Sequence, residues 1–152
     1  NDNGFILTGY KGISTNNADL WVIKTDSNGN VDWSNILGGS NYDVGYDVEQ
    51  TTDGGYIITG AQDAANSWDE EGSDIWLLKL DVNGNTEWEK IFDRTNGDRG
   101  YSVDQTSDGG YIISGQTWRS NSESWIDDLI LIKTDTEGNT VPIEDWEIIN
   151  ID

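Results

Sequence analysis

The chain contains no cysteine, no methionine and no histidine, and only one proline among its 152 residues. The lack of cysteine and histidine excludes disulfides, thiolate metal sites, haem ligation and acid–base catalysis by an imidazole. No apolar run approaches the roughly 20 residues that a transmembrane helix needs, so membrane insertion is not expected. No segment has a convincing apolar period of 3.6 residues, which argues against amphipathic helices. These absences favour a protein built from strands and turns.

Basic residues are also scarce, because 8 Lys and Arg stand against 29 Asp and Glu, a formal net charge of −21. This charge repels phosphate backbones and anionic membrane surfaces, which makes nucleic acid and lipid headgroups poor partners. Cations, basic proteins and neutral sugars remain open. The chain nevertheless has 8 Trp, 6 Tyr and 2 Phe, with its charges spread along its length, unlike a disordered acidic tail. We therefore expect a folded domain.

Three blocks of sequence recur with a period of about 55 residues. The first, Asp-Gly-Gly-Tyr-Ile-Ile, stands at residues 53–58 and 108–113, with a diverged copy near the amino terminus. The second runs from an aspartate through Gly-Asn to a tryptophan at 26–33 and 81–88, and returns in part after Asp135. The third joins an aspartate to Gly-Tyr, after Asp43 and again after Asp98. The chain is therefore predicted to be a repeat protein.

Each repeat divides into short apolar or alternating segments separated by glycine-containing turns, which predicts antiparallel strands joined by hairpins. In the complete middle repeat the expected strands are 46–51, 56–59, 75–80 and 86–92. Residues 75–78 are apolar throughout, which indicates burial on both faces. A lone sheet cannot provide that burial, whereas sheets stacked like propeller blades can. A β-helix is less suitable because its repeats are shorter and its rungs are parallel. The predicted fold class is all-β, a β-propeller of about three four-stranded antiparallel blades in an incomplete ring.

The segments 26–33 and 81–88 resemble the tryptophan-docking motif of quinoprotein-type propeller blades. The whole unit is similar to repeats found in large surface-exposed or secreted proteins of archaea and bacteria. This resemblance implies a scaffold or interaction module in an extracellular or cell-surface protein. The quinone-binding residues and the disulfide of the quinoprotein dehydrogenases have no match in this chain, so the resemblance does not imply their activity.

The resemblance also implies the order of strands within a blade, with 46–51 innermost and 86–92 outermost. Residues 1–152 then form a single repeat domain, and its three blades are 1–37, which lacks a first strand, 43–92, and 98–152, whose last strand diverges. A propeller ring typically needs at least about four blades. We therefore expect other blades to complete the ring, either in the same chain or in a homo-oligomer.

The expected strand order places the variable loops 10–18, 61–73 and 116–127 on one face, and such loops on a rigid scaffold commonly bind ligands. An exposed tryptophan beside a carboxylate, amide or arginine suits sugar recognition, because the ring covers an apolar sugar face while polar groups bind hydroxyls. The alternative is that each tryptophan folds back over its own blade. The candidate residues for glycan or peptide contact are Trp68, Asp69, Trp118, Arg119, Asn121 and Trp125.

Asp43 and Asp98 are further ligand-binding candidates, because they stand where the innermost strands begin, near the expected central channel. Paired carboxylates there could act as acid and base. Alternatively, they cap the turns before Gly45 and Gly100, and their repetition favours this interpretation. The leading hypothesis is therefore a non-catalytic extracellular scaffold for protein–protein or glycan contacts through its loop face. The alternative is a carboxylate-dependent glycosidase or polysaccharide lyase with its site at the central channel.

The turn around Asp26, Asn28 and Asn30 superficially resembles a calcium loop. An EF-hand loop needs a bidentate glutamate at its twelfth position, and the three repeats have other residues there, Leu37, Phe92 and Trp146. We favour side chains that bind the turn backbone, although another oxygen-lined calcium site remains open. No other cofactor is expected.

Each strand before these turns carries a lysine two residues ahead of the aspartate, at Lys24, Lys79 and Lys133. Residues at this spacing lie on the same face of a strand. The sequence therefore predicts a repeated ion pair between each lysine and that aspartate.

Overall fold

The computed structural model describes residues 2–14, 17–64, 72–93, 97–120 and 125–141, with backbone alone at 119–120 and 125–126. These residues form ten β-strands and no helix, which confirms the all-β prediction. Accordingly, the described part of the chain has no helix of the length and apolarity needed to cross a membrane. The strands are β1 (Phe5–Ser14), β2 (Asn17–Thr25), β3 (Val31–Leu37), β4 (Tyr42–Gln50), β5 (Tyr56–Ala64), β6 (Asp74–Leu80), β7 (Thr86–Phe92), β8 (Asp98–Gln105), β9 (Tyr111–Ser120) and β10 (Trp125–Thr134).

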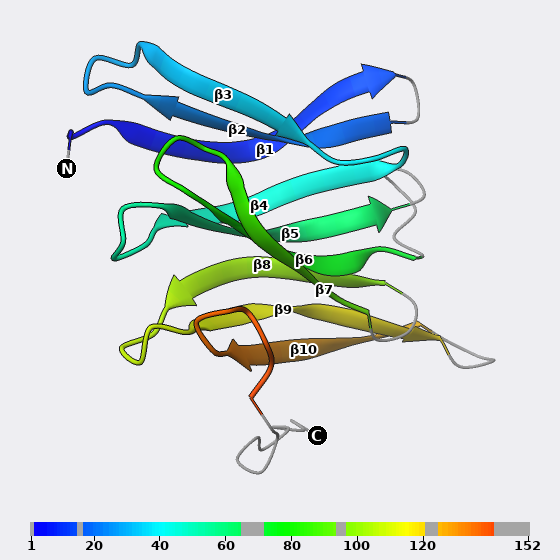
Figure 1. Ribbon diagram of the computed structural model, residues 1–152. Coiled ribbons are helices and arrows are strands. Elements are labelled where there is room, and N and C mark those ends of the chain that lie inside the picture. The colour runs from blue at the N-terminus through cyan, green and yellow to red at the C-terminus, as the bar shows by residue number, and fades with distance from the viewer. Residues whose placement is uncertain (1, 15–16, 65–71, 94–96, 121–124, 142–152) are drawn as a thin grey trace.

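Antiparallel pairing groups these strands into three meanders. The first meander is β1–β2–β3, the second is β4–β5–β6–β7, and the third is β8–β9–β10. A parallel bridge between Ala18 and Tyr42 joins the first two meanders into one seven-stranded sheet, and the third forms a separate sheet. Figure 1 shows the three meanders stacked one above another, with the strands of each running back and forth across the molecule.

The connections between strands lie at two opposite edges of this stack. The hairpins between β4 and β5 and between β8 and β9 lie at one edge, whereas the carboxyl ends of β1, β5 and β9 lie at the other (Figure 1). We call these the hairpin edge and the loop edge. Gly54 and Gly109 occupy equivalent hairpin positions with φ of 89° and 86°, a region that glycine adopts at little cost. The prediction of tight glycine hairpins is therefore confirmed.

The second meander is buried on both faces, as the continuous apolar sequence predicts. Toward the third meander, Ile57, Ile75 and Leu77 pack in one cluster with residues of β8, β9 and β10. Toward the first meander, Ile58 and Leu78 pack in a second cluster with residues of β2. Successive residues of β5 and β6 point to opposite faces, so each strand contributes to both clusters. Face-to-face packing of sheets thus supplies the core.

The tryptophans of the outer strands connect each meander to the next. Trp33 on β3 lies 5.7 Å from the ring of Tyr56, and Trp88 on β7 lies 5.7 Å from the ring of Tyr111. A side chain at Gly84, in the turn of the second meander, would collide with Trp33. These contacts support the interpretation of the two tryptophans as packing residues.

Candidate functional site

Both carboxylate oxygens of Asp26 bind its own turn. Oδ1 accepts the backbone N–H groups of Asn28 and Asn30 at 2.8 and 2.9 Å, and Oδ2 accepts the side-chain amide of Asn30 at 2.8 Å. Asp81 and Asp135 accept the same three bonds in their turns. These bonds hold the pKa of each carboxyl below its usual value, the side chain of the last asparagine contributing most. The turn interpretation is therefore confirmed.

The predicted partners of the three lysines are wrong. Lys79 Nζ lies 3.0 Å from Asp53 and 2.9 Å from Glu87, rather than beside Asp81. In the same way Lys24 pairs with Asp2, and Lys133 pairs with Asp108. The aspartate of the Asp-Gly-Gly turn is therefore the shared partner, because β5 and β6 are adjacent and bring that turn next to the lysine. The ion pair recurs in each meander, which marks it as a structural element.

Asp43 begins the inner strand β4 and is fully buried. Its carboxylate accepts the backbone N–H of Gly39 at 2.7 Å and that of Asp63 at 2.9 Å. It thereby ties the connection from the first meander to the end of β5. Burial raises the pKa of Asp43, with Asp63 and Asp19 adding to this and the two backbone donors opposing it. This geometry is that of a structural cap.

Asp98 begins β8 and is also buried. Its backbone N–H donates to Ser73 O at 2.6 Å, and its carbonyl accepts the Ser73 hydroxyl at 3.3 Å. Its charge contributes, with those of Asp93 and Asp63, to raising the pKa of Asp74, and burial of Asp74 contributes most. Together these effects place that pKa at about 6. Within the described residues, no group of three or more carboxylates is arranged to hold a metal ion.

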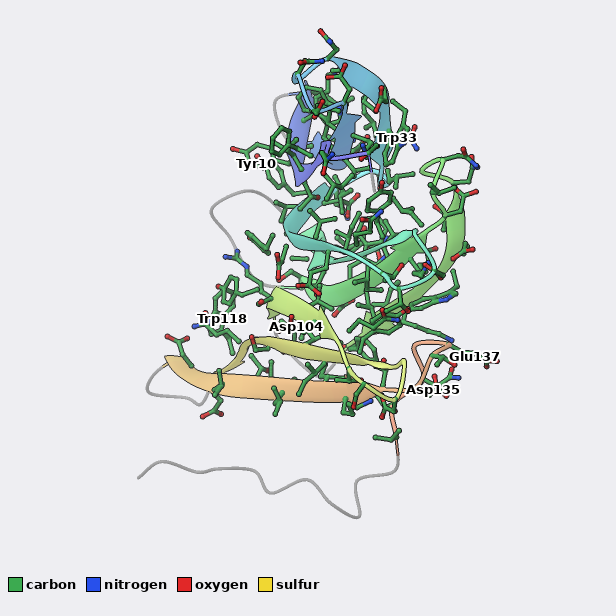
Figure 2. The ribbon with its side chains drawn as sticks, turned by 90° about the vertical axis from the view of Figure 1, so that its left-hand side faces the viewer. Tyr10, Trp33, Asp104, Trp118, Asp135 and Glu137 are labelled. Atoms are coloured by element: carbon green, nitrogen blue, oxygen red, sulfur yellow. The ribbon has the colours of Figure 1, made fainter. Side chains whose placement is uncertain are left out.

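The third meander carries an aromatic and polar patch near the loop edge. The Arg99 guanidinium lies over the Trp118 ring, 4.9 Å from its centroid, and the Tyr101 hydroxyl donates to Gln116 Oε1 at 3.0 Å. We call these four residues the β8–β9 patch. Cross-strand neighbours share a face, so the pairing of Arg99 with Gln116 sets this patch on one side of β8 and β9. Figure 2 shows Trp118 and Tyr10 on one flank of the molecule and Trp33, Asp135 and Glu137 on the opposite flank.

Of the predicted contact residues, Trp118 alone has a described side chain. Trp68, Asp69 and Asn121 lie outside the described residues, as do the side chains of Arg119 and Trp125. The other members of the β8–β9 patch, Arg99, Tyr101 and Gln116, were not predicted. A comparison of repeats would have found two of them, because Val44 stands at the position of Arg99 and Ala61 at that of Gln116.

A pair of carboxyl groups joins the inner strands of the second and third meanders. Glu49 on β4 shares a hydrogen bond with Asp104 on β8, and Asp47 Oδ2 accepts the Ser102 hydroxyl at 2.8 Å. Burial raises the pKa of Glu49, and the charge and hydrogen bond of Asp104 add to this effect. Figure 2 shows Asp104 on the third meander, between the flank of Trp118 and the flank of Glu137. The Glu49 carboxyl therefore keeps its proton to a higher pH than an isolated glutamate, because its pKa is raised.

Comparison with known proteins adds no assignment: no family model matches the chain, and no curated protein matches it in sequence.

Proposed function

We propose that the chain is an arc of β-propeller blades that acts as a non-catalytic binding scaffold of an extracellular or cell-surface protein. Three stacked antiparallel meanders, linked through Trp33 and Trp88, support the propeller assignment. The resemblance of the repeats to those of surface-exposed and secreted proteins supports the location. Ligands of this scaffold, either proteins or glycans, contact the loop edge.

The β8–β9 patch is the observation that carries this proposal. Most described polar residues that recur between meanders have structural partners, as the turn aspartates and the lysines do. The β8–β9 patch instead departs from the repeat, because Arg99, Gln116 and Trp118 replace Val44, Ala61 and Asp63. Packing between meanders does not require this change, since the smaller residues fulfil that role in the second meander. The departure therefore favours a role in binding.

The chemistry of the β8–β9 patch suits a ligand with hydroxyl or carboxylate groups and an apolar face. Arg99 supplies fixed donors, and Gln116 can both donate and accept. The Trp118 ring is half-buried and has the arginine over one face, and the rest of the ring offers apolar area. A positive group is also unusual in a chain with a net charge of −21, so Arg99 favours an anionic or hydroxyl-bearing partner.

Substitution of the patch tests the proposal. With an array of neutral and acidic glycans, Trp118→Ala should lower binding at least about ten-fold, the loss expected when a binding hot spot is truncated. Val82→Ala is the matched control, because Val82 is an exposed apolar residue at the hairpin edge. Equal binding by Trp118→Ala and the unchanged chain would contradict the assignment of this site. If the unchanged chain bound nothing on the array, glycans would be excluded as its ligands, and proteins would be the remaining ligand class.

A carboxylate-dependent glycosidase or lyase is the second candidate, and the Glu49–Asp104 pair favours it. Unlike Asp43, which is fully buried, Asp104 is exposed to solvent. A protonated carboxyl beside a carboxylate is the arrangement that acid–base hydrolysis of sugars uses. Release of reducing ends or unsaturated products from a polysaccharide panel, abolished by Glu49→Gln and by Asp104→Asn, would establish this function and reject the non-catalytic scaffold.

A further inference from the structure

The six tyrosines of the chain fall into two groups. Two of them, Tyr56 and Tyr111, are 2% exposed and pack against Trp33 and Trp88. The other four are exposed or half-buried, and they are Tyr10, Tyr42, Tyr46 and Tyr101. These four lie in two pairs of neighbouring rings.

Each pair of rings bridges two successive meanders. Tyr10 of β1 lies beside Tyr42 of β4, with the ring centroids 5.4 Å apart. Tyr46 of β4 lies beside Tyr101 of β8, with the ring centroids 5.3 Å apart. Strand pairing across the first boundary is a single bridge between Ala18 and Tyr42, and among the described strands none of the second meander pairs with one of the third. The ring contacts therefore lie where backbone pairing between meanders is sparse.

The composition of the chain directs oxidation to its aromatic rings. Cysteine and methionine are the side chains that oxidants commonly modify, and the chain has neither of them. Tryptophan and tyrosine are the oxidisable side chains that are left. The side chains of Tyr10, Tyr46 and Tyr101 are 55%, 39% and 41% exposed, so an oxidant in solution reaches both pairs. Removal of one electron and the phenolic proton from a tyrosine leaves a tyrosyl radical, and two such radicals in contact combine.

Hydrogen bonds beside the second pair hold its two strands together. Asp47 of β4 accepts the Ser102 hydroxyl at 2.8 Å and the backbone N–H of Val103 at 2.9 Å. The Tyr101 hydroxyl donates to Gln116 Oε1 at 3.0 Å, which orients its ring. Groups held in contact react with each other far more readily than with a second molecule, and the net charge of −21 opposes close approach of two molecules. Coupling within one chain is therefore favoured over coupling between chains.

We propose that the two tyrosine pairs are sites of oxidative cross-linking, at which hydrogen peroxide and a haem peroxidase join successive meanders by dityrosine bonds. Each tyrosine of a pair loses one electron and its phenolic proton, and the two radicals form one carbon–carbon bond between their ortho carbons. The hydrogen atoms of these carbons then move to the phenolic oxygens. Each link thus releases two electrons and two protons, which reduce one molecule of hydrogen peroxide to two of water. The modification is independent of ligand binding, so its failure would leave the proposed function intact.

Mass spectrometry of the oxidised chain tests this proposal. The folded full chain, treated in dilute solution with a haem peroxidase and hydrogen peroxide, should lose two hydrogen atoms for each link and gain the fluorescence of dityrosine. After tryptic cleavage, the peptide 25–79 should be joined to the peptides 1–11 and 100–119. Tyr46→Phe should remove the link to 100–119 and keep that to 1–11, and Tyr42→Phe should do the reverse. Each variant is therefore the matched control of the other.

The unfolded chain tests whether the fold brings the rings together. With a photoactivated ruthenium complex and persulfate, oxidants that need no folded enzyme, the yield of links within one chain should fall at least about ten-fold in urea. Equal yields in the folded and unfolded chains, links mainly between separate chains, or oxidised tryptophan without any link would each overturn the proposal. Far-ultraviolet circular dichroism shows whether each variant is folded. If one is not, Tyr101→Phe replaces Tyr46→Phe and Tyr10→Phe replaces Tyr42→Phe, since each removes the other member of the same pair.

Discussion

Lys79 illustrates how single polar residues stabilise the stack of meanders. Its side chain is 3% exposed, and its Nζ contacts Asp53 and Glu87 and also donates to Leu80 O at 3.2 Å. The two carboxylates are half exposed, so water solvates them while the ammonium group is enclosed. The Thr51 hydroxyl, the backbone N–H of Gly55 and Lys79 together hold the pKa of Asp53 at about 2. The pair joins the Asp-Gly-Gly turn to strands β6 and β7.

Lys79→Met should lower the free energy of unfolding by about 2 kcal/mol at pH 7. The reason is that Asp53 and Glu87 lose their cationic partner, whereas methionine keeps the apolar packing of the lysine side chain. The pKa of Asp53 should rise toward its usual value, which carbon-detected NMR can follow. A carboxyl whose pKa is lower in the folded chain than in the unfolded chain stabilises the fold at pH values above its unfolded pKa. This stabilisation is lost as the pH falls toward the folded pKa. The variant should therefore lose less stability than the unchanged chain between about pH 4 and 2. An unchanged Asp53 titration would contradict the role of Lys79.

Asp74 presents the opposite case, a carboxyl whose environment disfavours its charge. Burial and the nearby Asp93, Asp98 and Asp63 raise its pKa to about 6. A carboxyl whose pKa is higher in the folded chain than in the unfolded chain destabilises the fold when it is ionised. The free energy of unfolding therefore increases as the pH falls from 7 through 6 toward the pKa of the unfolded chain. Asp74→Asn should remove this dependence and stabilise the protein at pH 7 by about 1 kcal/mol, since solvent screening reduces the effect of a partly exposed group.

Urea denaturation at a series of pH values measures this change. The matched control is Asp127→Asn, which removes the same charge at an exposed position of β10. It should alter stability at pH 7 by less than Asp74→Asn and should keep the slope between pH 7 and the acid range. If both variants stabilised the protein equally, general charge repulsion rather than the site of Asp74 would be the cause.

At the scale of elements, the inner strands depend on close approach to the preceding meander. Gly45 on β4 lies against Thr8 of β1, and Gly100 on β8 lies against Thr59 of β5. A Cβ atom at either glycine would overlap the threonine hydroxyl oxygen. Each inner strand also has a register shift directly after this glycine, at Tyr46 in β4 and at Tyr101 in β8. Glycine followed by tyrosine is therefore a packing device, repeated in both strands.

Gly100→Ala should destabilise the protein by about 2 kcal/mol, the usual cost of inserting a methyl group into a filled interior. Thr59→Ala in the same chain should recover part of this loss, because it removes the oxygen atom that the new methyl group would overlap. Gly9→Ala is the control, since no atom lies within 4 Å of a Cβ placed there. Additive effects of Gly100→Ala and Thr59→Ala in a double-mutant cycle would contradict the proposed contact.

The elements were largely predictable, whereas the contacts between them were not. The predicted strand 86–92 coincides with β7, and the predicted strand 75–80 differs from β6 by one residue, because apolar runs between glycine turns are local signals. β5 continues to Ala64, past the predicted end at Thr59, through small and polar residues with weak strand preference. The partners of the lysines were mispredicted because strand pairing, not spacing along one strand, brings Asp53 to Lys79. Arg99 and Trp118 likewise meet across β8 and β9.

At the scale of the whole molecule, stability is expected to be unequal among the three meanders. The second meander has a neighbour on both faces, and its strands β5 and β6 are each paired on both edges. The first and third meanders each expose apolar side chains on one face, such as Leu7 and Leu129. Among the described strands, β1 is paired only with β2. The high acidic charge adds repulsion that every part of the molecule shares. Local opening should therefore begin at the two ends of the stack.

Native-state hydrogen exchange tests this gradient. In dilute solution the amides of β5 and β6 should exchange most slowly, with opening free energies near that of global unfolding, and those of β1 should exchange faster by about ten-fold or more. Burial on two faces is the physical reason, because an amide in β6 can exchange only after both apolar clusters separate. Equal protection of all strands in dilute solution would show instead that the three meanders unfold as one cooperative unit, and the end faces would then not be weak points.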